Sequence, residues 1–272
     1  MTFAVIGAGH VGSRVARLAG ALGMSVLLND PPLAEATGDA RYRPIDEVTP
    51  RADVVSLHVP LTATGRHPTR RMVDAAWLRR MKRGAVLINM ARGDVVDETA
   101  LKSAMHCGAL GGAVLDVWQN EPTPDPDLVR LADLSTPHVA GYSDDARIMA
   151  TKTVYQAFCR WCDQQPEWRP PARSMLTIDA AGVAVDSSLE ATLDAIVQIA
   201  FDIRGVSEAF KSAMTDETPV RAGAFEHLRR THPRRVQFSG FSVRGLENLS
   251  AADIIARLGF DGSQHTVRNA AQ

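Results

Sequence analysis

The sequence has no long apolar run, no excess of either charge and few cysteines. Its longest apolar stretches, 84–89 and 195–201, fall far short of the roughly 18 residues that a membrane-spanning helix needs. The 272 residues include 30 basic and 31 acidic side chains, and this balance argues against a strongly basic nucleic-acid-binding protein. The N-terminus lacks the basic region of a secretory signal peptide. We therefore expect a soluble, cytoplasmic protein that binds neither membranes nor nucleic acid.

The three cysteines are too few for a disulfide framework. Two of them, Cys159 and Cys162, form a C-x-x-C pair, a spacing that occurs in redox motifs and in structural zinc sites. Here the pair lies late in a helical pattern, and the sequence has no second pair to complete a zinc site. We expect two ordinary helix cysteines and no metal site.

Short apolar runs alternate with helical patterns from Thr2 to about Val139. The predicted strands are 3–6, 25–28, 53–59, 85–89 and 113–117. The predicted helices between them are 11–22, 74–81 and 97–106. Strands that are apolar on both faces and alternate with helices indicate a parallel sheet covered on both sides. Right-handed crossovers then predict an α/β, doubly wound Rossmann domain.

The pattern changes after about residue 143, where a single long helix is predicted over 144–164. A proline-rich stretch follows, and beyond it we predict helices over 188–204 and 221–230, the second leading into a β-like run over 236–243. This predicts three parts, namely a Rossmann domain with a trailing helix over 1–165, a linker over 166–174, and a smaller α+β domain over 175–272.

A nucleotide-binding fingerprint follows the first predicted strand. Residues 7–12 read G-A-G-H-V-G, which is G-x-G-x-x-G at the start of a helix, and Asp30 comes 18 residues after the last glycine. The glycines permit a tight turn, an approach to the pyrophosphate and close helix packing, while a carboxylate binds ribose hydroxyls and repels a 2′-phosphate. We therefore predict NAD rather than NADP, bound by Gly7, Gly9, His10, Val11, Gly12 and Asp30.

Three charged residues follow other predicted strands, where open α/β sheets bind ligands. Arg92 has the forked guanidinium that grips a carboxylate, and His138 titrates in the range that suits an acid or base. Glu121 beside His138 would favour the imidazolium and fix its orientation. Together these residues suit the oxidation of a 2-hydroxy acid.

The order of the motifs adds a resemblance. The chain carries G-A-G-H-V-G, L-H-V-P-L-T, G-A-V-L-I-N-M-A-R-G-D-V-V-D-E-T-A-L, L-D-V-W-Q-N-E-P and T-P-H-V-A-G-Y. Over residues 1–160 it resembles the D-isomer-specific 2-hydroxyacid dehydrogenases. The resemblance implies catalytic roles for Arg92, Glu121 and His138. It further implies that NAD contacts Val59, Asp116 and Gly141, and that the substrate contacts Tyr142.

Within that family the chain looks most like the erythronate-4-phosphate dehydrogenases. The features are Gly65–Arg70 in place of a shorter segment, tryptophan at 118, tyrosine at 142, and residues 175–272, which look like that branch's dimerisation domain. The resemblance implies a homodimer acting on a small phosphorylated 2-hydroxy acid. The implied reaction is the NAD-dependent oxidation of 4-phospho-D-erythronate to 2-oxo-3-hydroxy-4-phosphobutanoate in pyridoxal 5′-phosphate biosynthesis.

The resemblance begins at the nucleotide-binding domain, whereas members of that family normally begin with a segment that builds most of a substrate domain. We therefore expect activity to be impaired, because a closed cleft excludes water and orients the substrate. Three explanations stay open, namely a start placed too far downstream, a partner chain that supplies the segment, or a protein that binds NAD without turnover. The alternative functions are a non-catalytic dimeric NAD-binding module and a dehydrogenase for another D-2-hydroxy acid.

Overall fold

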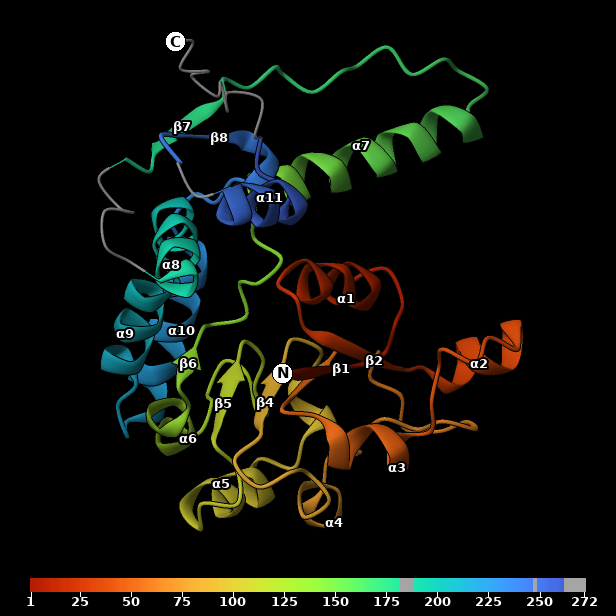
Figure 1. The fold of residues 1–272 in the computed structure, drawn as a ribbon, viewed down its shortest axis with the longest axis vertical. Coiled ribbons are helices and arrows are strands. Elements are labelled where there is room, and N and C mark those ends of the chain that lie inside the picture. The colour runs from red at the N-terminus through yellow and green to blue at the C-terminus, as the bar shows by residue number, and fades with distance from the viewer. Residues whose placement is uncertain (182–187, 247–248, 262–272) are drawn as a thin grey trace, which may run out of the picture. The chain divides into compact units, whose positions relative to one another are not determined.

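The computed structural model describes residues 1–181, 188–246 and 249–261 (Figure 1). The chain divides into two compact units. The first contains Met1–Ala140 and Arg204–Thr231, and the second contains Gly141–Ile203 and His232–Gln272. The predicted boundaries at 165 and 175 and the linker between them stay a prediction.

The first unit is built on a parallel sheet with the strand order β2-β1-β3-β4-β5-β6. Its strands are β1 (Thr2–Ile6), β2 (Ser25–Asn29), β3 (Val54–Leu57), β4 (Val86–Asn89), β5 (Gly112–Leu115) and β6 (Leu134–Ser135). The chain leaves β1 toward β2 and returns to pair β3 on the other side, so the fold is doubly wound, as predicted. The register places Ile6 beside both Asn29 and Leu57, so the carboxyl ends of these strands form one edge.

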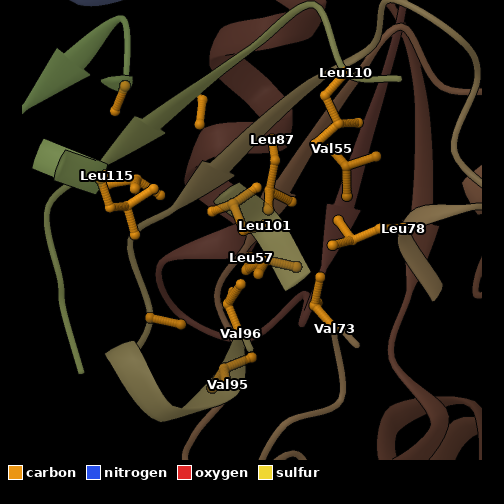
Figure 2. Close-up of a cluster of buried hydrophobic side chains, with 14 of the residues drawn as sticks. Val55, Leu57, Val73, Leu78, Leu87, Val95, Val96, Leu101, Leu110 and Leu115 are labelled. Carbon is orange, nitrogen blue, oxygen red and sulfur yellow. The ribbon is translucent and has the colours of Figure 1, made fainter. Parts of the chain in front are cut away.

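Helices cover both faces of this sheet. The helices of residues 1–140 are α1 (Gly12–Ala21), α2 (Pro31–Thr37), α3 (Ile45–Val48), α4 (Ala75–Leu78), α5 (Glu98–His106) and α6 (Pro126–Leu131). On one face, Ala19 of α1 packs against Phe3 and Val5. On the other, the main core joins Leu78 of α4 and Leu101 of α5 to side chains of β3, β4 and β5 (Figure 2). Burial of both faces explains why the strands read as continuous apolar runs.

Aspartates cap four of these helices, and Asp30 caps α2 by accepting the N–H of Leu33. Asp74, Asp97 and Asp125 each accept a backbone N–H of the first turn of α4, α5 and α6. Such caps satisfy amides that have no partner within the helix. Of the predicted helices, 97–106 matches α5, whereas 74–81 shortens to the four residues of α4.

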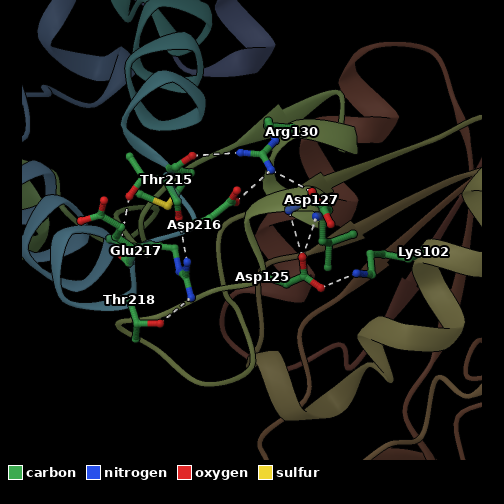
Figure 3. A network of polar contacts seen from close by, with 11 residues as sticks. Lys102, Asp125, Asp127, Arg130, Thr215, Asp216, Glu217 and Thr218 are labelled. Carbon is green, nitrogen blue, oxygen red and sulfur yellow. Dashed lines mark hydrogen bonds and ion pairs between the residues drawn. The ribbon is translucent and has the colours of Figure 1, made fainter.

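Two later helices, α9 (Ile203–Ala213) and α10 (Thr218–Arg230), contribute to the first unit. Phe210 and Phe225 are fully buried in its main core. Arg130 of α6 donates to the carbonyl of Met214 at 3.0 Å and also pairs with Asp127 and Asp216 (Figure 3). Residues 204–231 therefore pack against the end of the sheet near β6, which the sequence pattern did not predict.

The second unit contains α7 (Asp144–Trp161), α8 (Leu189–Ala200), α11 (Leu249–Leu258) and the parallel pair β7 (Leu176–Asp179) and β8 (Phe241–Arg244). The helix predicted over 188–204 was wrong at its end, because Phe201 takes an extended conformation after α8. The β-like run predicted from residue 236 was wrong in its first half, where residues 238–240 form a short 3-10 turn before β8.

Cys159 lies within α7 and Cys162 directly follows it, which confirms the prediction of helix cysteines; both are free thiols. In the described part of the chain, His, Cys, Asp and Glu side chains form no group of three or more that could hold a metal ion. No helix among residues 1–181, 188–246 and 249–261 has the length and apolarity needed to cross a membrane.

Candidate active site

The glycine-rich loop lies at the switch point of the sheet, between the ends of β1 and β3. Gly7 has φ +89°, and a Cβ on it would come within 2.8 Å of the His58 backbone and 2.9 Å of Val59 Cγ1. A Cβ on Gly12 would come within 1.9 Å of the Gly7 carbonyl oxygen, so only glycine lets α1 begin so close to the loop. Gly7 therefore lies against both Val59 and the start of α1, and the predicted contacts of Gly7, Gly12 and Val59 with NAD stay predictions.

The outer side of the same loop is open. Gly9, His10 and Val11 are exposed, and a Cβ on Gly9 would meet nothing within 4 Å. The first turn of α1 presents backbone amides and the positive end of the helix dipole in this direction. A tight turn with free space above a helix N-terminus fits the pyrophosphate of a dinucleotide.

Asp30 follows the end of β2 and faces the glycine-rich loop. One carboxylate oxygen accepts the N–H of Ala8 at 2.8 Å, and the other accepts the N–H of Leu33 at 3.0 Å at the start of α2. Each carboxylate oxygen has a second lone pair, so the side chain can still accept ribose hydroxyls. Asp30 therefore both holds the loop against α2 and keeps the acceptors that the NAD prediction requires.

Glu121 and His138 form the central pair of the site. His138 Nδ1 lies 2.8 Å from Glu121 Oε2, and the other oxygen of Glu121 accepts the Trp118 N–H at 2.9 Å. Burial pushes the pKa of Glu121 upward, but the hydrogen bonds from His138 and Trp118, with the charges of His138 and Arg229, outweigh it and hold that pKa below its ordinary value. Glu121 is therefore ionised at neutral pH.

The ionised carboxylate settles which nitrogen of His138 is protonated. Because the ionised Glu121 can only accept, Nδ1 carries a hydrogen, and in the neutral form of the ring Nε2 therefore has the lone pair. His138 has φ +55°, in the left-handed region that a non-glycine residue seldom adopts. Strained backbone of this kind gathers at functional sites, and here it aims the ring at Glu121.

Asp116 holds the loop that carries His138. The side chain is 2% exposed, and it accepts hydrogen bonds from Thr136 Oγ1 at 2.6 Å, the Val139 N–H at 2.7 Å and the Ala140 N–H at 3.0 Å. These three donors explain why a carboxylate is buried directly after β5. The predicted contact of Asp116 with NAD stays a prediction beside this structural role.

Arg92 follows β4 on an exposed turn. Its Nη1 donates to the carbonyl of the neighbouring Ala91 at 2.6 Å, and within the described residues no carboxylate pairs with the guanidinium. The side chain thus keeps donors that can grip a substrate carboxylate in a fork.

Gly141 and Tyr142 lie in the second unit and begin the segment that leads to α7. The Tyr142 ring meets His232 edge-on with 6.4 Å between ring centroids, and the Arg147 guanidinium lies 5.2 Å from the Tyr142 centroid. The predicted roles of Gly141 toward NAD and of Tyr142 toward the substrate stay predictions.

Sequence reasoning missed one buried carboxylate near the pair. Glu98 is 8% exposed and accepts the Gln119 N–H at 2.6 Å. Burial, together with the charges of Asp125, Asp94 and Glu121, raises its pKa to about 7 against the hydrogen bond from Gln119, which lowers it. An acidic residue in a first helical turn is common, so the sequence held no sign that this one points inward.

Comparison with known proteins agrees with this geometry. Residues 1–140 match the family described as D-isomer specific 2-hydroxyacid dehydrogenase, NAD binding domain. The erythronate-4-phosphate dehydrogenase of Salinibacter ruber is 40% identical over 257 residues, which cover 90% of this chain and 64% of that protein. The enzyme of the same name from Pseudomonas aeruginosa strain UCBPP-PA14 is 33% identical, with 95% and 68% covered.

Among solved structures, the NAD complex of a D-isomer specific 2-hydroxyacid dehydrogenase from Lactobacillus delbrueckii ssp. bulgaricus is similar, with 31% identity and a TM-score of 0.52. The match covers 61% of this chain and 54% of that one. The chain thus spans just under two thirds of the length of the Salinibacter relative.

Proposed function

Since the chain belongs to the D-isomer specific 2-hydroxyacid dehydrogenases and carries their NAD-binding domain, we propose that it oxidises 4-phospho-D-erythronate to 2-oxo-3-hydroxy-4-phosphobutanoate. The substrate is the finer part of the proposal, and it is supported by relatives that are 33% and 40% identical and are named erythronate-4-phosphate dehydrogenases. The observation that carries the proposed chemistry is the 2.8 Å contact between His138 and Glu121 at the edge of the sheet.

His138 is the proposed base. Its Nε2 takes the proton of the C2 hydroxyl, and the resulting imidazolium is stabilised by the ionised Glu121 at Nδ1. The hydroxyl oxygen loses its proton and C2 loses a hydride, so the C2 alcohol becomes a ketone.

Arg92 is the proposed carboxylate anchor. A bidentate guanidinium pair would hold C1 and so fix which face of C2 is presented to the cofactor. NAD supplies the hydride acceptor when it is bound. The proposed NAD contacts are made by Gly7, Gly9, His10, Val11, Gly12, Asp30, Val59, Asp116 and Gly141, with Tyr142 on the substrate.

The test is an assay of NADH formation by the full chain with 4-phosphoerythronate, beside D-lactate and D-glycerate as unphosphorylated substrates. Turnover that depends on Arg92 and prefers the phosphorylated acid is expected, and Arg92→Ala should remove it while NAD still binds. Binding of NAD with no turnover on any of the three acids would instead favour a non-catalytic NAD-binding module. Equal turnover on all three would favour another 2-hydroxy acid as the substrate.

We also propose a homodimer formed through residues 175–272. Within the described residues β7 pairs with β8 alone, and Leu176 of β7 is 46% exposed. An unpaired strand edge with apolar side chains is a template for pairing with a second copy. Light scattering of the full chain should give twice the chain mass, and a monomer at micromolar concentration would contradict this.

A further inference from the structure

Two segments that carry proposed catalytic groups lie directly against each other. One runs from Arg92 to Glu98, and the other runs from Trp118 to Glu121. A Cβ on Gly93 would lie 2.0 Å from the Trp118 carbonyl carbon and 2.4 Å from the Gln119 nitrogen. The turn after Arg92 therefore rests on the Trp118–Gln119 peptide, and no larger residue fits at position 93.

Two hydrogen bonds hold Gln119 in place, one from its backbone and one from its side chain. Glu98 Oε1 accepts the Gln119 N–H at 2.6 Å, and the Gln119 side chain donates from Nε2 to the Val96 carbonyl at 3.1 Å. Glu98 is the first residue of α5, whose remaining turns pack into the main core through Leu101. Gln119 is thus tied to α5 and to the residues directly before it.

Trp118, which precedes Gln119, connects the peptide between them to His138. The Trp118 N–H donates to Glu121 Oε1 at 2.9 Å, and Glu121 Oε2 lies 2.8 Å from His138 Nδ1. The Trp118 indole N–H donates to the Thr136 carbonyl at 2.9 Å, on the loop that carries the histidine. Consecutive N–H groups therefore face opposite partners, Trp118 toward Glu121 and Gln119 toward Glu98.

We propose that Glu98 is a positioning residue, which holds the Trp118–Gln119 peptide in the orientation that keeps Glu121 aligned with His138. The consequence for turnover rests on the proposed dehydrogenase function. The consequence for the hydrogen bond between Trp118 and Glu121 does not depend on that function. Without an acceptor at position 98 the Gln119 N–H loses its partner, and the turn over residues 118–121 loses one of its restraints. The Trp118 N–H and Glu121 both belong to this turn, so their hydrogen bond weakens when the turn shifts.

The surroundings of Glu98 determine which substitutions test its role. Burial and the negative charges of Asp125, Asp94 and Glu121 raise its pKa to about 7, while Lys102 is the nearby cation. The protonated and the ionised carboxyl group each present an acceptor oxygen to Gln119. Glutamine keeps that acceptor without charge, whereas leucine fills a similar volume without any acceptor.

The experiment compares the full chain with Glu98→Gln and Glu98→Leu. The first readout is amide hydrogen exchange at Trp118, measured by NMR with no substrate present. Glu98→Leu should speed exchange at Trp118 by about tenfold, and Glu98→Gln should leave it near the wild-type rate. Amides of β1 and β3 serve as the internal reference, because a purely structural loss of stability would speed their exchange as well.

The second readout is steady-state kinetics with NAD and 4-phosphoerythronate. Glu98→Leu should lower kcat by about tenfold with an unchanged KM for NAD, and Glu98→Gln should retain most of the wild-type kcat. Unchanged Trp118 exchange in Glu98→Leu overturns the proposal, and so does equal loss of kcat in both variants. If the wild-type chain shows no turnover, the proposed function fails and the exchange data alone decide the role of Glu98. If Glu98→Leu does not fold, Glu98→Ala replaces it with the same two readouts.

Discussion

Replacing Glu98 with glutamine should change how the stability of the protein depends on pH. The Glu98 carboxyl group is 8% exposed, and its pKa is raised from the ordinary 4.5 to about 7, first by burial and then by nearby negative charges. Because the folded-state pKa lies above the unfolded one, the folded state holds the proton more tightly. Its contribution to stability is full below pH 4.5 and is lost as the pH rises through 7.

The magnitude follows from the two pKa values. They differ by about 2.5 pH units, and at 1.36 kcal/mol per unit the ionised carboxylate costs about 3 kcal/mol of folding free energy above pH 8. Most of this loss of folding free energy, about 2.5 kcal/mol, occurs between pH 5 and pH 8. Glutamine has no ionised form, so Glu98→Gln should gain about this much stability over the wild type when the pH rises from 5 to 8.

Urea unfolding of both proteins at pH 5 and pH 8 measures this difference, because all other titrating groups are shared and cancel. Glu208→Gln, at an exposed position of α9, is the control. It shows how much the removal of an exposed carboxylate changes the free energy of unfolding between the two pH values. The reasoning is refuted if the wild type and Glu98→Gln differ by the same free energy at both pH values.

Three further outcomes test the site. Gly12→Ala should weaken NADH binding at least tenfold in a fluorescence titration, because its Cβ would lie 1.9 Å from the Gly7 oxygen and push α1 from the loop; unchanged affinity would contradict the close approach. Asp30→Ser should narrow the preference for NADH over NADPH, since the carboxylate that repels a 2′-phosphate is gone, and equal ratios of the two dissociation constants would refute this. Glu121→Gln should lower kcat by about tenfold to a hundredfold while NADH affinity holds, because the imidazolium loses its counter-charge; a kcat near wild type would remove Glu121 from the mechanism.

The central sheet was predictable because its strands are buried on both faces. Runs such as Phe3–Ile6 are apolar on both faces, so their composition alone indicates strands in the interior of a sheet. Two glycines of the fingerprint were predictable for a related reason, since Gly7 and Gly12 are each required by the local backbone geometry. Helix α2 was not predicted, although proline at 31 and 32 suits the first helical positions.

The second half of the chain was less predictable. The predicted helix over 188–204 joined α8 to the start of α9, whereas Phe201 is extended after α8 and α9 begins at Ile203. Nothing in the sequence of α9 and α10 indicates that Phe210 and Phe225 are buried in the core of the first unit, because that depends on contacts with residues far away along the chain. Periodicity reports that a face is apolar, and it does not report which surface covers it.

For the candidate site, the sequence by itself determined which residue types stand at the ends of the strands, and with them the family and the cofactor. Arg92, Glu121 and His138 follow different strands, and a parallel sheet brings the carboxyl ends of its strands to one edge. Only the tertiary structure decided how the pair is held, through Asp116 beneath the histidine loop and Glu98 beneath the Trp118–Gln119 peptide. The reason is that hydrogen bonds across 20 or more residues depend on orientation, which residue spacing along the chain does not encode.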